Sequence, residues 1–565
     1  MFEKYLTRSS FSSYDDFCKN LEINVPERFN FAYDVVDRLA ADEPDLKALL
    51  WTDTNGAEIS FSFADMASLS DKTASFFQSL GIGRGDRVML ILKRHWQFWT
   101  SMMALHKLGA VAIPATHLLT AKDIIYRCEK AHVKMIVAAG DEQIVRHISD
   151  ALPQCPTLKA LVSTGPCVPE GWHDMNSGVD HAAPFVRPEI ANENDDVMLL
   201  YFTSGTSGEP KMVAHDFTYP LGHIVTASFW HNLHPGSRHL TVADTGWGKA
   251  VWGKLYGQWL ARAEVFVYDF DKFIPTDLLS RMEKYHITSF CAPPTVYRFM
   301  IRENLSAYDL SALEYCTTAG EALNPSVAER WTKATGVKLR EAFGQTETTL
   351  TIGTFPWMEP RPGSMGKPNP QYDIRVVDNN MREVGPGEEG EIVIRVPENG
   401  PKPVGLFKEY LDDPDLTEAA WHDGFYHTGD IARRDEDGYF YFVGRKDDVI
   451  KSSGYRIGPF EVESACLTHP AVVECAITAV PDDVRGQVVK ATIVLAKEYV
   501  SKRGAELIKD IQDHVKRITA PYKYPRVIEF VKELPKTISG KIRHVAIRQA
   551  DARAAGSVPV RPRHC

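Results

Sequence analysis

Residues 201–211 read YFTSGTSGEPK, and this stretch decides how the rest of the chain is interpreted. It follows the apolar run 197–200, which is typical of a buried strand. Small and hydroxylated residues come next: Thr203, Ser204, Gly205, Thr206, Ser207 and Gly208. Glycines let a backbone approach an anion with its N–H groups, hydroxyls add donors, and Lys211 adds a cation. The composition therefore predicts a phosphate-binding loop.

The loop differs from the common phosphate loop of nucleoside triphosphatases. That pattern, G-x-x-x-x-G-K-[ST], places Gly before the Lys and a hydroxyl after it. Here Pro210 precedes Lys211 and Met212 follows it, which excludes a generic P-loop kinase. A solvated Ser/Gly linker is the alternative for an isolated run of this composition. The Pro and the Lys at fixed places directly after a strand favour the phosphate loop.

The whole chain has the composition of a globular protein with more than one domain. Its 565 residues exceed what one core holds, and 44% are hydrophobic, 24% are charged, with a net charge of −10. This mild acidity argues against nucleic-acid binding, which usually needs a concentrated basic face. Nine scattered cysteines favour a reducing compartment over disulfides or a zinc site. Because neither a signal peptide nor a spanning apolar run is found, we expect a cytoplasmic protein without a membrane span.

Strands and helices alternate along the first part of the chain. We predict strands at 87–93, 111–114 and 133–139, helices at 96–108 and 122–131, and further strands at 265–268 and 289–292. Such alternation implies a largely parallel sheet covered on both faces. We therefore expect two α/β units, one on either side of the phosphate loop.

From about residue 367 the pattern changes to short strands separated by Gly, Pro, Asn and Asp, which predicts a small β-barrel. A compact mixed segment follows residue 459. The predicted fold class is α/β: a large N-terminal domain of two α/β subdomains plus a small β-barrel, followed by a small mobile α+β C-terminal domain. We place the boundary near Asp447, giving domains of residues 1–446 and 447–565.

Three further stretches carry chemistry. The carboxylate of Glu347 in EAFGQTE can hold a divalent cation beside phosphate oxygens. Asp430 in YHTGD can accept both hydroxyls of a ribose. Lys541 in PKTISGK can neutralise charge that develops at a reacting phosphate. Taken alone, each residue is more often a solvated side chain or part of a turn.

Together these motifs resemble the adenylate-forming superfamily, which comprises acyl-CoA synthetases, adenylation domains of peptide synthetases and firefly-type luciferases. They occur in the family's order over residues 30 to 550. The resemblance implies that Thr346 lies near the α-phosphate of ATP, that Glu347 holds Mg²⁺ and that Lys541 is catalytic. It assigns ATP and AMP binding to Thr203, Ser204, Gly205, Thr206, Ser207, Gly208, Lys211, Glu341, Ala342, Phe343, Gly344, Gln345, Thr346, Asp430, Arg445 and Lys541.

The segments SSGYRIGP, APYKYPR and PKTISGK most closely resemble those of the medium-chain acyl-CoA synthetases. The resemblance implies that Gly454 leaves room for the pantetheine arm of CoA and that Asp447 is a hinge. It assigns CoA binding to Ser453, Gly454, Tyr455, Arg485, Lys516, Tyr524 and Arg526. Lys516 and Arg526 suit the 3′-phosphate of CoA.

The acyl pocket is expected around ADTGWGKAVWGK, with Cys291 and the AGE segment. Its predicted residues are Trp247, Lys249, Trp252, Cys291, Gly320 and Arg456. Tryptophans supply apolar walls, although most are simply core. Lys249 is unusual in such a place: it either shortens the pocket, meets a polar substrate group or points away. We expect a short- to medium-chain aliphatic acid, straight or branched.

The sequence thus predicts an ATP-dependent acyl-CoA synthetase, an enzyme that uses ATP, Mg²⁺ and CoA on a small carboxylic acid, as a monomer or homodimer. An amino-acid or aryl-acid adenylating enzyme that does not use CoA is the alternative. The peptide-synthetase form of that alternative usually has an Asp where Gly248 stands, and no carrier domain follows. A luciferase-like oxygenase is disfavoured by the CoA motifs. A non-catalytic binder would not need Lys541.

Overall fold

The computed structural model describes residues 1–165, 168–204, 210–397, 400–452, 455–482, 484–536 and 542–556. The chain forms two compact units, one of Met1–Ile374 and Ile394–Tyr426 and the other of Arg375–Val393 and His427–Cys565. We call them unit 1 and unit 2. The predicted boundary near Asp447 lies inside unit 2. Among the described helices, none combines the length and the apolar character that a membrane span requires.

The first sheet of unit 1 has the strand order β19-β9-β8-β4-β3-β5-β6-β7. Its strands are β3 (Arg87–Ile91), β4 (Val111–Pro114), β5 (Met135–Ala139), β6 (Ala160–Thr164), β7 (His173–Asp174), β8 (Val197–Ser204), β9 (Pro210–Asp216) and β19 (Glu409–Tyr410). The helices of this region are α3 (Phe63–Ser79), α4 (Gln97–Leu108), α5 (Ala121–Ala131), α6 (Glu142–Ala151) and α7 (Met175–Asp180). Strands β3 to β6 pair in parallel, as the alternating pattern predicted.

The second sheet of unit 1 has the order β16-β15-β14-β13-β12-β10-β11-β1-β2. Its strands are β1 (Lys47–Asp53), β2 (Glu58–Ser62), β10 (Arg238–Thr241), β11 (Glu264–Asp269), β12 (Ser289–Ala292), β13 (Tyr315–Ala319), β14 (Leu339–Phe343), β15 (Ile352–Gly353) and β16 (Lys367–Pro368). Its helices are α8 (Tyr219–Ile224), α9 (Gly248–Lys254), α10 (Tyr256–Leu260), α11 (Pro275–Lys284), α12 (Pro294–Met300) and α13 (Pro325–Thr335). The central strands, β1 and β10 to β14, again pair in parallel.

The chain begins with short helices, α1 (Tyr14–Asn20), a π-helical turn at Ala32–Asp37 and α2 (Arg38–Asp42). The end of α4 shows why a glycine is needed there. Gly109 has φ +66°, and a Cβ on it would lie 1.9 Å from the carbonyl oxygen of Ala191. Only a residue without a side chain allows this close approach of two segments.

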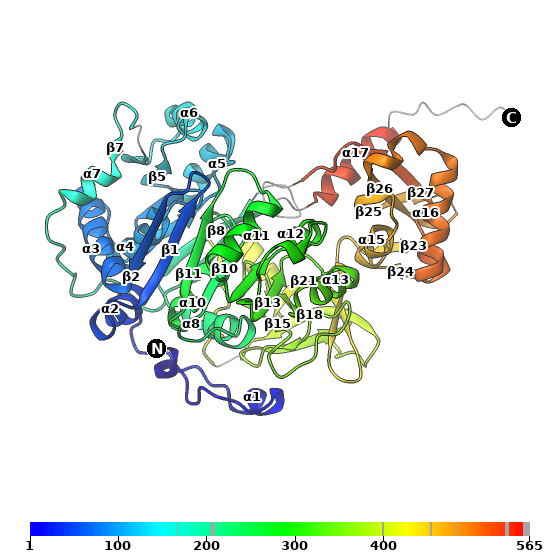
Figure 1. Ribbon diagram of the computed structural model, residues 1–565, viewed down its shortest axis with the longest axis horizontal. Helices are drawn as coiled ribbons and strands as arrows, with labels where there is room; N and C mark the ends of the chain where they lie inside the picture. The colour runs from blue at the N-terminus through cyan, green and yellow to red at the C-terminus, as the bar shows by residue number, and fades with distance from the viewer. Residues whose placement is uncertain are drawn as a thin grey trace. The chain divides into compact units, whose positions relative to one another are not determined.

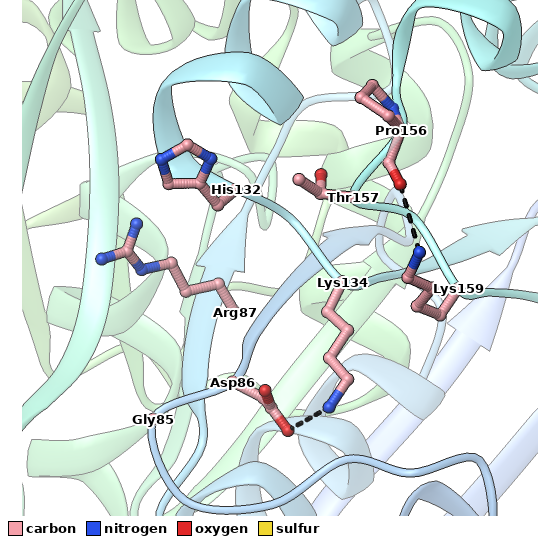
Figure 2. Close-up of a pocket in the computed structure, with 8 residues that line it drawn as sticks. All are labelled: Gly85, Asp86, Arg87, His132, Lys134, Pro156, Thr157 and Lys159. Carbon is pink, nitrogen blue, oxygen red and sulfur yellow. Dashed lines mark hydrogen bonds and ion pairs between the residues drawn. The ribbon is translucent and has the colours of Figure 1, made fainter.

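Charged residues gather at the amino ends of β3, β5 and β6, around an open cavity of about 540 Å³. Figure 2 shows Lys134 paired with Asp86, at 2.8 Å, and Lys159 with the carbonyl of Pro156, at 3.3 Å. Arg87 and His132 lie on another side of the same cavity.

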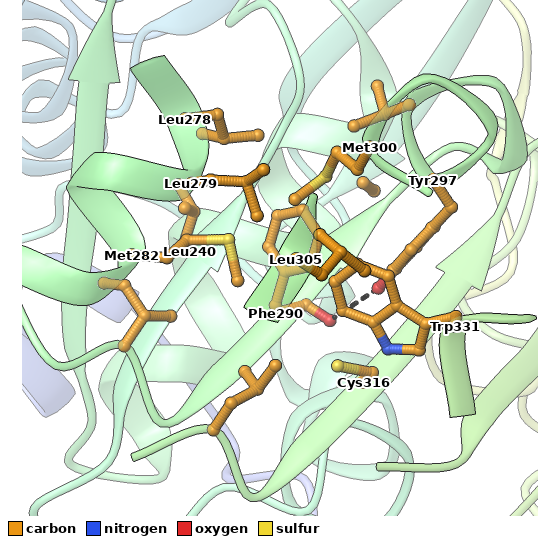
Figure 3. Close-up of a cluster of buried hydrophobic side chains, with 14 of the residues drawn as sticks. Leu240, Leu278, Leu279, Met282, Phe290, Tyr297, Met300, Leu305, Cys316 and Trp331 are labelled. Carbon is orange, nitrogen blue, oxygen red and sulfur yellow. Dashed lines mark hydrogen bonds between the residues drawn. The ribbon is translucent and has the colours of Figure 1, made fainter. Parts of the chain in front are cut away.

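Helices α11, α12 and α13 form one layer over the second sheet (Figure 1). Their apolar faces meet the strands in the large buried cluster drawn in Figure 3. Phe290 of β12 lies at its centre, beside Tyr297 of α12 and Trp331 of α13, with ring centroids 5.2 and 6.2 Å away. This cluster packs the helices against β12, β13 and β14, whose carboxyl ends lead to the predicted site residues.

The segment predicted as a small barrel forms a five-stranded sheet, β17-β18-β21-β20, with β22 on β21. The elements here are β17 (Asp373–Val377), β18 (Glu389–Arg395), α14 (Pro414–Ala420), β20 (Trp421–His422), β21 (Phe425–Arg434) and β22 (Phe440–Arg445). Strand β21 pairs antiparallel with β20 and with β22.

The last sheet, in unit 2, has the order β24-β23-β26-β25, with β27 on β26. Its elements are β23 (Ile450–Ser452), β24 (Tyr455–Ile457), α15 (Pro459–Leu467), β25 (Val472–Asp482), β26 (Gly486–Leu495), α16 (Ala505–Ile518), β27 (Val527–Val531) and α17 (His544–Gly556). Figure 1 shows the three helices around these strands. The mixed α+β segment predicted after residue 459 is confirmed.

The cluster under α11 gives a stability prediction. Leu279 is fully buried, so Leu279→Ala should lower the free energy of unfolding by about 2–5 kcal/mol through lost burial and the cavity left behind. The urea midpoint of unit 1 measures the loss. Ile274, five positions earlier and 42% exposed, provides the control, since Ile274→Ala should change the free energy by less than about 1 kcal/mol. Equal losses would show that the cluster does not hold this layer.

Candidate functional site

The predicted phosphate loop connects two antiparallel strands. In the hairpin of β8 and β9, Thr203 lies opposite Lys211 and Ser204 opposite Pro210. Four of the predicted loop residues, Gly205, Thr206, Ser207 and Gly208, lie outside the described residues, as does the side chain of Ser204. The hairpin register therefore places Lys211 beside Thr203 at the base of the loop.

Lys211 and Glu347 both contact a third residue, Tyr410. The Tyr410 hydroxyl donates to Oε1 of Glu347 at 2.9 Å, and the ammonium of Lys211 lies 5.0 Å from the centroid of the Tyr410 ring. Strand β19, which carries Tyr410, pairs with β9 next to Lys211. Sequence reasoning missed Tyr410, because no motif contains it and its partner Glu347 is 63 positions away.

A buried histidine joins this hairpin to the segment after β14. His215 of β9 donates from Nε2 to the carbonyl of Thr346 at 2.7 Å. Burial lowers the pKa of His215 to about 3, so the ring is neutral and its single N–H is available for this bond. No sequence motif includes His215. The bond fixes the backbone at Thr346, the residue predicted to lie near the α-phosphate.

The turn after β14 is tightly packed. A Cβ on Gly344 would lie 2.2 Å from the ring of Trp252 and 2.8 Å from the carbonyl oxygen of Thr349, so the position accepts only glycine. The Tyr426 hydroxyl donates to Oε1 of Gln345 at 2.7 Å. Gly344 and Gln345, both predicted to bind nucleotide, thus lie on a rigid turn. Ala342 and Phe343 lie on β14 directly before it.

Glu341 of β14 is fully buried. Burial raises its pKa to about 8, against the opposing effect of the hydrogen bond that it accepts from the Leu323 N–H at 3.2 Å. The carboxyl group therefore stays protonated at neutral pH. Together with Leu323 it lines a cavity of about 650 Å³ between α13 and residues 354–364. Its assignment to ATP and AMP binding stays a prediction.

The predicted acyl-pocket residues converge around α9. Trp252 packs against Gly344, and the ammonium of Lys249 donates to the carbonyl of Ala319 at 2.7 Å, at the end of β13. Gly320 follows with φ +97°. Helix α9 therefore connects the carboxyl end of β13 with the turn after β14, and Lys249 points toward this junction.

The remaining residues predicted for the acyl pocket are Trp247, Cys291 and Arg456. Trp247 is the residue before α9, and Cys291 lies on β12, where it is 1% exposed. The side chain of Arg456 lies outside the described residues.

In unit 2, Asp430 and Arg445 form a pair. They lie opposite each other on β21 and β22, and Arg445 Nη1 donates to Oδ1 of Asp430 at 3.1 Å. Asp430 is buried, whereas the Arg445 side chain is 42% exposed. Both residues were predicted to bind the nucleotide, and the structure brings them together.

The predicted CoA residues form two groups in unit 2. The cationic groups of Lys516 and Arg526 lie 4.3 and 4.7 Å from the ring centroid of Tyr524. Tyr455 stacks on Tyr522 at 4.2 Å between centroids. Sequence reasoning missed Tyr522, although it stands two positions before Tyr524 in APYKYPR. The backbone N–H of Arg485 donates to Oδ1 of Asp482 at 2.8 Å. Ser453, Gly454 and Lys541 lie outside the described residues.

The basic cavity in Figure 2 is a weaker candidate for a ligand site than the residues described above. Lys134 donates to Asp86 and to the carbonyl of Gly81, at 2.8 and 2.7 Å, and Lys159 donates to Pro156. The cavity lies at the amino ends of the parallel strands, whereas ligands of open α/β sheets bind beyond the carboxyl ends.

Comparison with protein-family models gives two matches. Residues 36–411 match the model of the AMP-binding enzymes, and residues 461–541 match the model of the C-terminal domain of these enzymes.

Curated relatives and solved structures agree with these matches. The mitochondrial acyl-coenzyme A synthetase ACSM3 of Pongo abelii is 42% identical over 96% of this chain and 93% of its own length, and the Homo sapiens protein of that name is 41% identical over the same shares. The anthranilate CoA ligase AuaEII, solved with anthranoyl-AMP, superposes with a TM-score of 0.85 at 28% identity, covering 94% of this chain and 99% of its own. A Brucella canis acyl-CoA synthetase superposes with a TM-score of 0.73 at 28% identity, covering 96% and 100%.

Glu341 gives a prediction about pH. Its pKa is raised from 4.5 to about 8, so the folded state holds its proton more tightly than the unfolded state. Between these two values the folded state binds more protons, and this carboxyl therefore lowers stability as pH rises through that window. Glu341→Gln removes the titration, so the variant should lose less stability than the wild type between pH 5 and 8.

Thermal midpoints measured across that range test the prediction. Glu329, which is exposed on α13, is the matched control, and Glu329→Gln should follow the wild-type profile. Parallel profiles for Glu341→Gln and the wild type would show that the carboxyl is ionised in the folded protein.

Proposed function

The chain belongs to the AMP-binding enzymes and is an acyl-CoA synthetase, and we propose that it acts on short- to medium-chain carboxylic acids. In the proposed reaction the acid and ATP give acyl-AMP and pyrophosphate, and the CoA thiol then displaces AMP. The observation that carries this proposal is the convergence of Lys211, Tyr410 and Glu347 beside the hairpin, with Thr346 held by His215. It supplies a cation, a carboxylate and a fixed backbone around one point, as a reacting triphosphate requires.

We assign the first half-reaction to unit 1 residues together with Lys541. Lys211 binds phosphate oxygens, and Thr346 orients the α-phosphate. Glu347 fits a divalent cation, because Mg²⁺ prefers oxygen ligands and the hydroxyl of Tyr410 orients this carboxylate. Glu347 would hold Mg²⁺ there, where the ion would neutralise charge on the triphosphate. Lys541 stabilises the charge that develops as the acid attacks.

For the second half-reaction we propose that CoA binds on unit 2. Lys516 and Arg526, which both contact the ring of Tyr524, offer two cations to the phosphates of CoA. The stacked pair of Tyr455 and Tyr522 offers an aromatic surface, 51% and 38% exposed, on which an adenine can stack. Gly454 then leaves room for the pantetheine arm.

We propose that Asp447 is the hinge between the two halves of the reaction. Lys541 acts in the first half and the surface around Gly454 in the second, and both follow Asp447 in the chain. A rotation about a few backbone angles exchanges the two surfaces. Asp430 and Arg445 precede the hinge, and we assign them to the ribose.

We propose that the substrate is short. Trp252 packs against Gly344 and Lys249 extends to the carbonyl of Ala319, and we propose that both side chains occupy volume that a long acyl chain would need. Of the three roles considered for Lys249, we propose that it shortens the pocket, because its ammonium is engaged by a backbone carbonyl.

Two predictions from the sequence stay proposals. We expect a cytoplasmic protein, which fractionation of the source cells tests; the two curated relatives are mitochondrial by name. We expect a monomer or a homodimer, which light scattering after gel filtration distinguishes.

Pyrophosphate release with MgATP, measured across aliphatic, aryl and amino acids with and without CoA, tests the function. We expect turnover with aliphatic acids of about three to ten carbons that rises at least tenfold when CoA is added, because CoA removes the bound acyl-AMP. Release driven by an amino acid or aryl acid and indifferent to CoA would favour the alternative, an adenylating enzyme without CoA. Because an anthranilate CoA ligase is among the structural neighbours, the panel of acids must include aryl acids.

Lys541→Ala should separate the two half-reactions. We expect acyl-AMP formation to fall by roughly 10²–10³-fold, because the charge developing at the α-phosphate loses its counter-charge. Conversion of preformed acyl-AMP to thioester should continue at the wild-type rate. Stopped assays of each half-reaction measure the difference. A variant that forms acyl-AMP normally would remove Lys541 from the first half-reaction.

A further inference from the structure

The last sheet of unit 2 has two different faces. Successive residues of a strand point to opposite sides, and Ile477, Val489, Ala491 and Ile493 form an apolar core with α15 and α16. Lys490, between two of these positions, belongs to the opposite face. There its ammonium pairs with Asp551 of α17 at 2.5 Å and with Glu529 at 2.6 Å. Helix α17 therefore covers a face that contains a buried charge.

Helix α17 forms three ion pairs. His544 Nε2 lies 2.8 Å from Oε1 of Glu463, Arg548 pairs with Asp448, and Asp551 pairs with Lys490. Positions 544, 548 and 551 share one helix face, because they are four and three residues apart. Ile547 is the apolar contribution of α17 to the buried cluster with Ala476 and Leu534. Specific charge pairs therefore add to apolar burial in holding this helix.

One of these contacts, between His544 and Glu463, also orients the helix start. Glu463 accepts the N–H of Ile477 at 2.9 Å as well as the imidazole of His544. Burial lowers the pKa of His544, but the hydrogen bond and the charge of Glu463 outweigh it and raise that pKa overall. Glu463 therefore ties α15, β25 and the first residue of α17 together.

The segment that contains Lys541 is joined to α17 without a spacer. Residues 537–541 lie between Lys536 and Ile542, which pair as an antiparallel bridge, and the Arg543 N–H donates to the carbonyl of Pro535 at 2.8 Å. The helix then begins at His544. The ends of the lysine segment are thus fixed to the helix that Arg548 anchors.

The turn at Asp447 is held differently on its two sides. Before it, Arg445 pairs with Asp430 of β21 and Lys446 pairs with Glu391 of β18, at 3.1 and 2.9 Å. After it, Asp448 pairs with Arg548 of α17. Asp447, between these pairs, is exposed. Adjacent residues of one turn are therefore anchored to the sheet of β18 and β21 on one side and to α17 on the other.

We propose that Asp448 and Arg548 are positioning residues that couple the hinge turn to the lysine segment. The pair makes α17 turn with the residue that follows the hinge, so that Lys541 arrives at one defined place when the domain rotates. This inference rests on the proposed roles of Asp447 and Lys541. Neither Asp448 nor Arg548 needs to touch a substrate.

The test measures both half-reactions in the full-length protein with the acid that gives the highest turnover. Arg548→Gln and Asp448→Asn should each lower the rate of acyl-AMP formation about 10- to 100-fold, because displacement of a reacting group by about 1 Å has effects of this size. Conversion of synthetic acyl-AMP and CoA to thioester should change by less than about twofold. Asp448→Arg combined with Arg548→Asp restores the pair and should recover adenylation to within about threefold.

Three controls make the outcome decisive. Arg503→Gln, an exposed arginine in the same unit, should leave both rates unchanged. Where the charge-swapped protein does not fold, Arg548→Lys, which keeps the charge, should retain more adenylation than Arg548→Gln. Lys541→Ala is measured alongside: if it loses adenylation while Arg548→Gln does not, this inference fails and the proposed function stands.

Equal losses in both half-reactions would overturn the proposal, because they indicate a general loss of structure. A folded charge-swapped protein without recovery would overturn it as well, because the pair would then not be the interaction that matters.

Discussion

The hydrogen bond from His215 to the carbonyl of Thr346 is the interaction on which the arrangement of unit 1 depends. It joins β9, in the first sheet, to the turn after β14, in the second. Since burial keeps the imidazole neutral, the bond needs no counter-ion and no water. Tyr410, on the strand paired with β9, also donates a hydrogen bond to Glu347. Together the two bonds fix the hairpin of β8 and β9 relative to the turn after β14. A site assembled from two sheets requires such a fixed joint, because small errors in the position of reacting groups cost large factors in rate.

The second constraint is that the reaction needs two different surfaces at one reacting centre. The groups proposed for the phosphates and the acyl chain belong to unit 1. Asp430, the residues proposed to bind CoA and the segment that contains Lys541 belong to unit 2. Within unit 2, Arg445 and Lys446, before Asp447, pair with the sheet of β18 and β21, whereas Asp448, after it, pairs with Arg548 of α17. The exposed residue proposed as the hinge therefore lies between ion pairs to two different partners.

Local pattern predicted the parts of the structure that depend on local causes. The alternation over 87–139 gave parallel strands β3, β4 and β5 with α4 and α5 between them, because periodic burial is visible within a single segment. The contacts of Tyr410 and His215 could not be predicted in that way, since their partners are 63 and 131 positions away. The close approach of Trp252 to Gly344 is also invisible in a sequence, where the glycine has several explanations.

Helix α17 shows a further limit of sequence patterns. His544, Arg548 and Asp551 pair with Glu463, Asp448 and Lys490, and Ile547 is the residue of this helix in the buried apolar cluster, so hydrophobic periodicity gives a weak signal for it. The same feature suits its proposed task. Apolar burial stabilises a helix in any nearby orientation that hides the same area, whereas charge pairs favour the one orientation in which each pair is made. The role proposed for Lys541, reaching one phosphate oxygen after a domain rotation, depends on orientation more than on added stability, and ion pairs on the helix that follows it suit that role.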